Sequence, residues 1–287
     1  MPAMRTLLPM VILCAACSPS VPDDGEAAEA TKRSYATQTT APSPDYRALL
    51  DQPAPGDGGW KQREATSPPP PDARTIGEAW LARLKERGAL LGHGLAGPEG
   101  PVDLIDTGFT EAEFDRWADE NGWPAPTHIR WSFVPKMNLP SVSEAARDSI
   151  RVWPASTSRT GAQNQALYHG HVELRDGCFF VGEFGQPADK LAWFHAEMGL
   201  DVDAAGYFIL RDRISGQTLA RLGEDMNWGG PASAEIAKEA EHALREACGS
   251  NEIFIVGSPE ARERFLTQHP HLRESLLPPP PPPPSAS

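Results

Sequence analysis

Hydrophobic and polar positions alternate most regularly between residues 165 and 184, where two short runs flank an Asp-Gly pair at Asp176 and Gly177. This arrangement predicts a β-hairpin, because a type I′ turn requires positive φ at both central positions. Pairing across the turn creates one apolar face from Val172, Leu174, Phe179 and Val181. The opposite face is mixed and carries His169, His171, Glu173, Cys178, Phe180 and Phe184. We expect another element to cover part of this mixed face.

Apolar residues at helical spacing predict four helices. The first starts at Asp72 and ends near Gly88, and the second begins with a capping box of Thr110 and Glu113. The third spans residues 233–248, with a stripe of Ile236, Ala240, Leu244 and Cys248, and the fourth spans 259–268. The glycine-rich segment 92–101 between the first two helices is predicted to be a loop, since it lacks a phosphate-binding fingerprint.

Further apolar runs predict strands that are closely spaced along the second half of the chain. They cover residues 128–134, 150–153, 190–195, 206–210, 218–222 and 252–256. The last run is almost continuously apolar, which is typical of a central strand. Strands at this spacing favour a sandwich or a small barrel.

These elements predict an α+β fold with five parts. A signal peptide covers residues 1–16, a disordered tether 17–71, a small helical or α+β lobe 72–148, a β-domain 149–272, and a proline-rich tail 273–287. The β-domain is expected to be a small antiparallel barrel or sandwich with a packed helix. The composition of the tether and the tail supports little apolar burial, so both ends are expected to be disordered.

The charge balance restricts the classes of partner. The chain has 26 basic and 39 acidic side chains and a formal net charge of −13. Nucleic-acid-binding proteins normally present a basic surface, so no nucleic-acid partner is expected.

The chain begins with MPAMRTLLPMVILCAAC, in which one basic residue precedes a short apolar run that ends in small residues. This run is too short to span a membrane and is typical of a secretory signal peptide. Its end, from Leu13 to Cys17, resembles the lipobox of bacterial lipoproteins. The resemblance implies a lipid on Cys17, attachment to a membrane through this anchor, and an outer-membrane location facing the periplasm because Ser18 follows. The alternative is an ordinary cleaved signal peptide with Cys17 as a free thiol.

A second resemblance concerns the β-domain. Asp176-Gly177-Cys178, Arg221–Asp225 and Trp228–Pro231 are similar to small OB-like β-barrel domains of uncharacterised bacterial secreted proteins and lipoproteins. The resemblance covers about 100 of the 287 residues and implies a fold without an activity.

Two sets of side chains are candidates for covalent or metal chemistry. In an exported protein, Cys178 on the hairpin and Cys248 on the helix stripe predict a disulfide that holds the helix over the mixed face, with two buried thiols as the alternative. His169, His171 and Glu173 share a strand face, and His195 is a potential third imidazole ligand for zinc. Because no metal-binding motif supports these residues, the favoured interpretation is a polar strand face, with no metal and no cofactor.

The sequence therefore predicts a non-enzymatic lipoprotein of the cell envelope that binds another envelope component, with a protein of the envelope as the expected partner. No GxSxG or SxxK motif is present, and no catalytic residue is assigned. The first alternative is a metal-dependent hydrolase that uses His169 and His171. The second is a small-ligand-binding barrel with its mouth near Trp228.

Overall fold

The computed structural model describes residues 34–39, 46–52, 59–96, 102–160, 167–183, 185–229, 234 and 236–272. All of them belong to one structural unit, Ser34–Ser287. The predictions for the signal peptide, Cys17 and the proline-rich tail lie outside the described residues, as does Phe184. None of the described helices is both long enough and apolar enough to cross a membrane.

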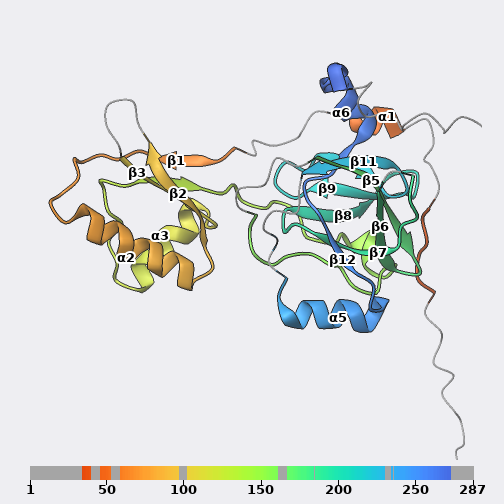
Figure 1. The fold of residues 1–287 in the computed structure, drawn as a ribbon, viewed down its shortest axis with the longest axis horizontal. Coiled ribbons are helices and arrows are strands. Elements are labelled where there is room, and N and C mark those ends of the chain that lie inside the picture. Colours follow the sequence, from red (N-terminus) through yellow and green to blue (C-terminus); the bar gives the residue numbers. More distant parts are fainter. Residues whose placement is uncertain are drawn as a thin grey trace, which may run out of the picture. The chain divides into compact units, whose positions relative to one another are not determined.

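The N-terminal lobe is a four-stranded sheet with two helices packed on it (Figure 1). In chain order its elements are β1 (Lys61–Arg63), α2 (Ala73–Glu86), β2 (Leu90–Ala96), β3 (Val102–Thr107), α3 (Glu111–Glu120) and β4 (Arg130–Phe133). The strand order is β1-β4-β3-β2, in which β3 and β4 are parallel and the other two pairs are antiparallel. The described residues of this lobe thus combine helices and strands in an α+β arrangement.

Both helices of this lobe form for the local reasons that the sequence indicates. Thr110 caps α3 through the Glu113 backbone N–H, and the Glu113 carboxylate accepts a hydrogen bond from the Thr110 backbone N–H. The apolar stripes of α2 and α3 meet over the sheet, where Trp80 and Phe114 both contact the Trp131 ring at centroid distances of 5.3 and 4.7 Å. The core of the lobe is therefore mainly aromatic.

The expectation of a loop at residues 92–101 is wrong for its first part, because Leu90–Ala96 forms strand β2. Close packing accounts for one of the two glycines in this strand. A Cβ atom added at Gly92 would lie 2.9 Å from the Asp106 carboxylate on the neighbouring strand β3, whereas one added at Gly94 would meet nothing within 4 Å. Glycine therefore indicates a loop less reliably than the pattern suggests, because it also occurs in strands where a neighbour approaches closely.

The C-terminal lobe contains a six-stranded sheet and a three-stranded sheet. The larger has the order β12-β7-β6-β5-β11-β13 and the smaller the order β10-β9-β8. The elements are α4 (Glu144–Arg147), β5 (Leu167–Arg175), β6 (Cys178–Glu183), β7 (Lys190–Phe194), β8 (Met198–Val202), β9 (Phe208–Asp212), β10 (Thr218–Arg221), β11 (Asp225–Gly229), α5 (Lys238–Cys248), β12 (Ile253–Val256), β13 (Glu260–Ala261), α6 (Arg262–Gln268) and the 3-10 turn η1 (Pro270–Leu272).

The two sheets share one hydrophobic core, to which β5 and β6 contribute Val172 and Phe179 while β8 and β9 contribute Leu200 and Leu210. The described strands do not form a closed barrel, since β12 and β13 are the two edges of the larger sheet. The larger sheet is also not purely antiparallel, because β12 runs parallel to β7. The prediction of an antiparallel barrel is therefore wrong, whereas the α+β class is correct.

The central hairpin is confirmed in register and in turn. Leu174 pairs with Phe179 and Val172 with Val181. Asp176 and Gly177 have φ values of 48° and 75°, as a type I′ turn requires. The local pattern was sufficient here because the turn alone sets the register.

Strand β12 was expected near the centre of a sheet but lies at an edge. Its residues are apolar because other parts of the chain cover both faces of the strand, although it has a hydrogen-bonded neighbour on one side only. Ile253 and Ile255 pack under α5, while Phe254 packs against the main core. The apolar run of β12 therefore indicated correctly that both of its faces are buried, but the central position that it predicted is wrong.

Other boundaries also differ from the predictions. Residues 150–153 form no strand, and helix α5 begins at Lys238 rather than at 233. Strands β8 and β11 lie outside the runs that the sequence predicts as strands.

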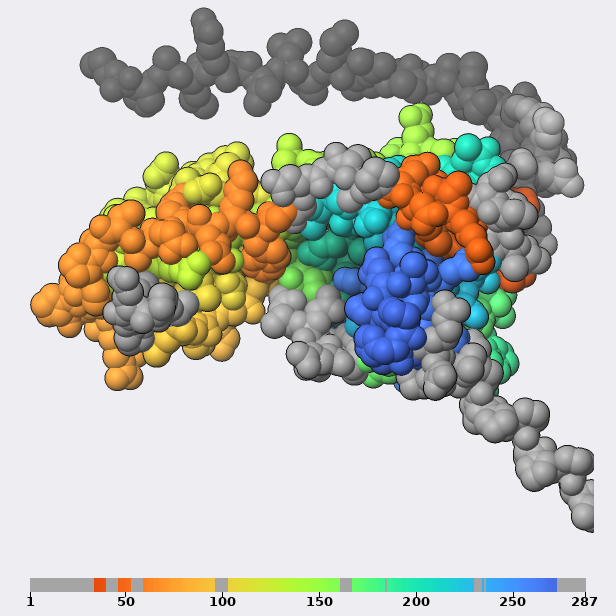
Figure 2. All heavy atoms as spheres, turned by 90° about the horizontal axis from the view of Figure 1, so that it is seen from above, coloured from red at the N-terminus to blue at the C-terminus, as the bar shows by residue number. Residues whose placement is uncertain are grey.

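Part of the expected tether is ordered against the folded lobes. Strand β1 pairs with β4, and the short helix α1 (Tyr46–Leu50) buries Tyr46 and Leu50 against Ala261. Figure 2 shows the segment 46–52 on the surface directly beside α6. The side chain of Gln38 is also buried, at 8% exposure. The structure thus differs from the predicted tether at 34–39, 46–52 and 59–71.

Candidate functional site

The histidine pair of β5 lies on one strand face, as the alternation indicates, and each member is bound to a neighbour within the sheet. His169 is hydrogen bonded through Nδ1–H to the side-chain oxygen of Asn227 on β11. His171 lies 3.4 Å from the carboxylate of Glu173, which also contacts Arg175 at 3.5 Å. These contacts complete a polar strand face.

His195, the other candidate ligand, is far from this pair. The strand register places position 189 level with His171, so His195 lies six residues farther along the strand (195 − 189 = 6), which corresponds to about 20 Å. His195 is buried at 1% exposure, and burial lowers its pKa. Within the described ranges, no group of three or more His, Cys, Asp or Glu side chains could hold a metal ion.

The two cysteines of the folded region do come together. The sulfur atoms of Cys178 and Cys248 lie at disulfide-bonding distance, with Cα atoms 5.7 Å apart and 70 residues between them in the sequence. They connect the start of β6 to the end of α5. Helix α5 covers Phe180, Leu191 and Trp193, so part of the mixed hairpin face is covered as expected.

Three tryptophans, including the Trp228 expected at the mouth of a ligand-binding barrel, are core residues. Trp131, Trp193 and Trp228 are between 0% and 1% exposed. Trp153 is stacked on Phe194 with a centroid distance of 4.7 Å. Trp228 is covered by Tyr168 and Phe254, so it does not form the mouth of a ligand site.

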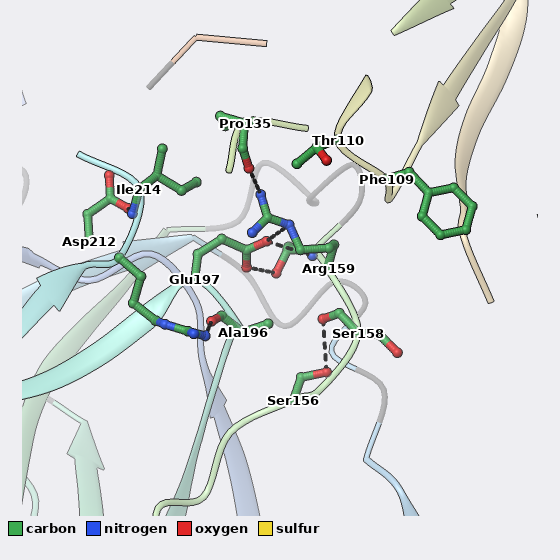
Figure 3. Close-up of polar contacts among 12 residues, drawn as sticks. Phe109, Thr110, Pro135, Ser156, Ser158, Arg159, Ala196, Glu197, Asp212 and Ile214 are labelled. Carbon is green, nitrogen blue, oxygen red and sulfur yellow. Dashed lines mark hydrogen bonds and ion pairs between the residues drawn. The ribbon is translucent and has the colours of Figure 1, made fainter. Parts of the chain in front are cut away.

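A buried ionic cluster, which no sequence pattern predicts, lies where β7 leads into β8. Arg159 forms an ion pair with Glu197 at 3.3 Å, and these side chains are only 12% and 16% exposed. The same carboxylate accepts hydrogen bonds from the backbone and hydroxyl groups of Thr160, at 3.0 and 2.7 Å. Figure 3 shows the Arg159 guanidinium between this carboxylate and the carbonyl of Pro135, to which it donates at 2.6 Å.

A second guanidinium lies beside the pair. Arg213 donates to the carbonyls of Ala196 and Leu139, at 2.6 and 3.0 Å. Burial lowers the pKa of both arginines, and the charge of Arg159 lowers that of Arg213 further. The carboxylates of Glu197, Glu113 and Asp212 offset part of this lowering at Arg159, so the largely buried cluster contains both positive and negative charges.

Arg159 also lines an open cavity of about 560 Å³. The cavity is lined by helix α3, the chain that enters it and residues 134–137, with Phe109 and Trp117 as its aromatic surface. Its charged side chains are Arg87, Arg116, Lys136, Arg159, Glu113 and Glu120. Hereafter we call this hollow the basic cavity.

No pattern in the sequence predicts this cavity. Its basic residues are separated by up to 72 positions (159 − 87 = 72) and belong to no motif. Arg159 is one arginine in a polar segment that the sequence identifies only as a loop. Only the tertiary structure brings these side chains to one place.

A second buried ion pair has a structural explanation. Arg221 donates through Nε to the carboxylate of Asp203 at 2.8 Å, and the side chains are 2% and 3% exposed. The rings of Tyr46 and Tyr207 lie 4.8 and 4.3 Å from the guanidinium. Because this arginine is enclosed on all these sides, it has no free surface for a ligand.

Comparison with known proteins identifies no relative. No protein-family model, no curated protein and no solved structure matches the chain. The function must therefore be argued from the chain itself.

Proposed function

We propose that this protein is a non-enzymatic binding module of the bacterial cell envelope, anchored by a lipid on Cys17 and facing the periplasm from the outer membrane. The observation that carries the proposal is the placement of Cys178 and Cys248 at bonding distance. Disulfides persist in oxidising compartments and are rare in the cytosol, so this pair supports export. The resemblance of Leu13–Cys17 to a lipobox supports the anchor.

The basic cavity supports a binding role. It is concave, combines aromatic surface with charged groups, and has a volume within the range of small-ligand sites. A protein partner in the envelope could present such a ligand group. We also interpret the two sheets of the C-terminal lobe, which share one core, as a sandwich-like pair of layers.

The distance between the anchor and the fold is bounded. Ser34, the first described residue, follows Cys17 by 17 positions (34 − 17 = 17). Even fully extended, this length reaches at most about 60 Å. The proposed anchor would therefore keep the C-terminal lobe near the membrane, because residues 34–39 are hydrogen bonded to it.

Fatty-acid labelling tests the anchor. We would express the full chain in a Gram-negative host that is fed a labelled palmitate, beside the variants Cys17→Ser and Ser20→Ala. Label and membrane retention should be lost with Cys17→Ser and kept with Ser20→Ala, a control three residues away that lies outside Leu13–Cys17. Labelling that survives Cys17→Ser, or an unlabelled wild-type chain, would refute the lipoprotein assignment.

The alternatives receive no support from a specific contact. The metal-dependent hydrolase would need ligands beyond His169 and His171, whereas His169 is bonded to Asn227 and His195 lies at the other end of the sheet. The small-ligand-binding barrel would need Trp228 at an open mouth, and this side chain is buried.

A further inference from the structure

The basic cavity differs in charge from the chain as a whole. Four of its side chains are basic and two are acidic, whereas the whole chain has 26 basic and 39 acidic residues. One of the two acidic groups is already engaged, because Glu113 accepts hydrogen bonds from the backbone and hydroxyl groups of Thr110 at 2.8 Å each. The cavity is thus a local basic site on an acidic protein.

Three of the four cations lie at the exposed rim. Arg87, Arg116 and Lys136 come from the end of α2, from α3 and from the segment after β4. Across the described part of the chain, none of these three side chains forms an ion pair with a carboxylate. Their charges are therefore available to a ligand.

The fourth cation is held in place. Glu197 and the Pro135 carbonyl fix the guanidinium of Arg159 in the wall (Figure 3). A fixed guanidinium loses little side-chain freedom on binding, which favours recognition of an anion with several oxygen atoms.

We propose that the basic cavity binds the phosphate group of an anionic ligand, whose organic part packs against Phe109 and Trp117. A phosphate presents oxygens in several directions, which suits cations that approach from three separate segments, whereas a carboxylate is satisfied by one planar fork. This inference gives a ligand class to the binding role proposed above and rests on it. The phosphate could belong to a soluble phosphate monoester or to a lipid headgroup.

Calorimetric titration of the purified protein tests the proposal. The ligands are inorganic phosphate, glucose 6-phosphate and, as the uncharged control, glucose. We expect glucose 6-phosphate to bind more tightly than inorganic phosphate and glucose not to bind. Affinity should fall as salt is added, because the contacts are between charges near the surface. Absence of binding by every phosphate compound, including the lipid tested below, would overturn the proposal.

Charge-removing variants locate the site. Arg116→Gln and Lys136→Gln should each weaken phosphate binding about tenfold, since each removes one charged contact. Lys85→Gln is the matched control, because Lys85 is an exposed cation on α2 that does not line the cavity. Equal affinities in all variants would place the phosphate elsewhere and refute the assignment.

Vesicles distinguish the two sources of phosphate. Phosphatidylglycerol vesicles should compete with glucose 6-phosphate if the ligand is a lipid headgroup, and phosphatidylcholine vesicles serve as the neutral comparison. Competition identifies a lipid, and its absence together with binding of the sugar phosphate identifies a soluble ligand. Either result is independent of the fatty-acid labelling of Cys17. An experiment that refutes phosphate binding can therefore be distinguished from one that refutes the lipid anchor.

Discussion

A single glutamine ties the segment before α1 to the C-terminal lobe. The amide of Gln38 donates to the carbonyl of Leu222 at 2.6 Å and accepts from the backbone N–H of Phe208 at 2.7 Å. Its backbone exchanges two hydrogen bonds with Leu174 on β5, where β11 no longer pairs. Gln38 therefore forms hydrogen bonds with buried backbone groups in β5, at the start of β9 and just after β10. Its role is structural.

Replacing this amide should destabilise the lobe. Gln38→Met keeps the approximate volume of the side chain but leaves Phe208 N–H and Leu222 C=O without their partner. Because each unsatisfied buried group costs about 1–3 kcal/mol, the free energy of unfolding should fall by about 2–4 kcal/mol. Urea denaturation measures the change, and Thr39→Ala, at an exposed neighbouring position, is the control. Equal stability of both variants would show that this segment does not contribute to the fold.

A carboxyl group in the loop before β11 predicts a dependence of stability on pH. Burial and, to a lesser extent, the charge of Asp225 raise the pKa of Glu224 to about 6 from 4.5. The folded state thus retains a proton between these pH values that the unfolded state releases. The stabilising contribution is fully present below about pH 4.5 and is lost as the pH rises through about 6.

The variant Glu224→Gln should remove this dependence. At pH 7 it should raise the free energy of unfolding by about 1 kcal/mol, after allowance for solvent screening of a half-exposed group. Denaturation midpoints at pH 4.5 and pH 7 test this, with Glu239→Gln on the exposed face of α5 as the control. An unchanged pH slope in Glu224→Gln would contradict the raised pKa.

At the scale of elements, helix α5 covers part of the mixed face of the hairpin. Leu244 of α5 is fully buried against Leu191 and Trp193 of β7. Arg151 supports the same corner, because its guanidinium donates to the carbonyls of Asp176 and Ala247 at 2.9 and 3.1 Å. The cysteine pair lies at this corner and limits the separation of helix and hairpin.

The disulfide itself is a prediction with a direct measurement. Peptide mapping under non-reducing conditions should recover the fragments of Cys178 and Cys248 as one linked species. Reduction should lower the free energy of unfolding by about 4 kcal/mol, because a loop of 70 residues is released in the unfolded chain. Two thiols that react with an alkylating reagent before reduction would exclude the bond.

At the scale of the whole molecule, the chain before α2 belongs to both folded lobes. Strand β1 extends the N-terminal sheet, and Gln38 and Tyr46 dock on the C-terminal lobe. The hydroxyl of Tyr46 accepts a hydrogen bond from the Arg221 backbone N–H at 2.9 Å, and burial raises the pKa of this tyrosine. A boundary at residue 72 would cut through both lobes.

Two truncated chains test this view. A chain that starts at Ser34 retains all of these contacts, whereas one that starts at Asp72 loses β1, Gln38, Tyr46 and Leu50. The shorter chain should be less stable by about 3–6 kcal/mol, because two large buried side chains and the hydrogen bonds of Gln38 and Tyr46 to the C-terminal lobe are lost. Thermal and urea unfolding of the two chains measure the difference. Equal stability would restore the interpretation of this segment as a tether.

The sequence alone determined the elements whose causes lie within a few residues. The hairpin register follows from the Asp-Gly turn, and the start of α3 follows from Thr110 and Glu113. The buried stripe of α5 follows from apolar residues at every fourth position. These interactions depend on neighbours in the chain, so a pattern contains all the information they need.

Only the tertiary structure decided the features that join distant segments. The edge position of β12, the docking of Gln38 and the Arg159–Glu197 cluster depend on partners tens to hundreds of residues away. Neither residue type nor spacing specifies which distant surface a strand or an arginine will meet. The folded path of the chain specifies it, and the same path assembles the cavity in which we place the ligand.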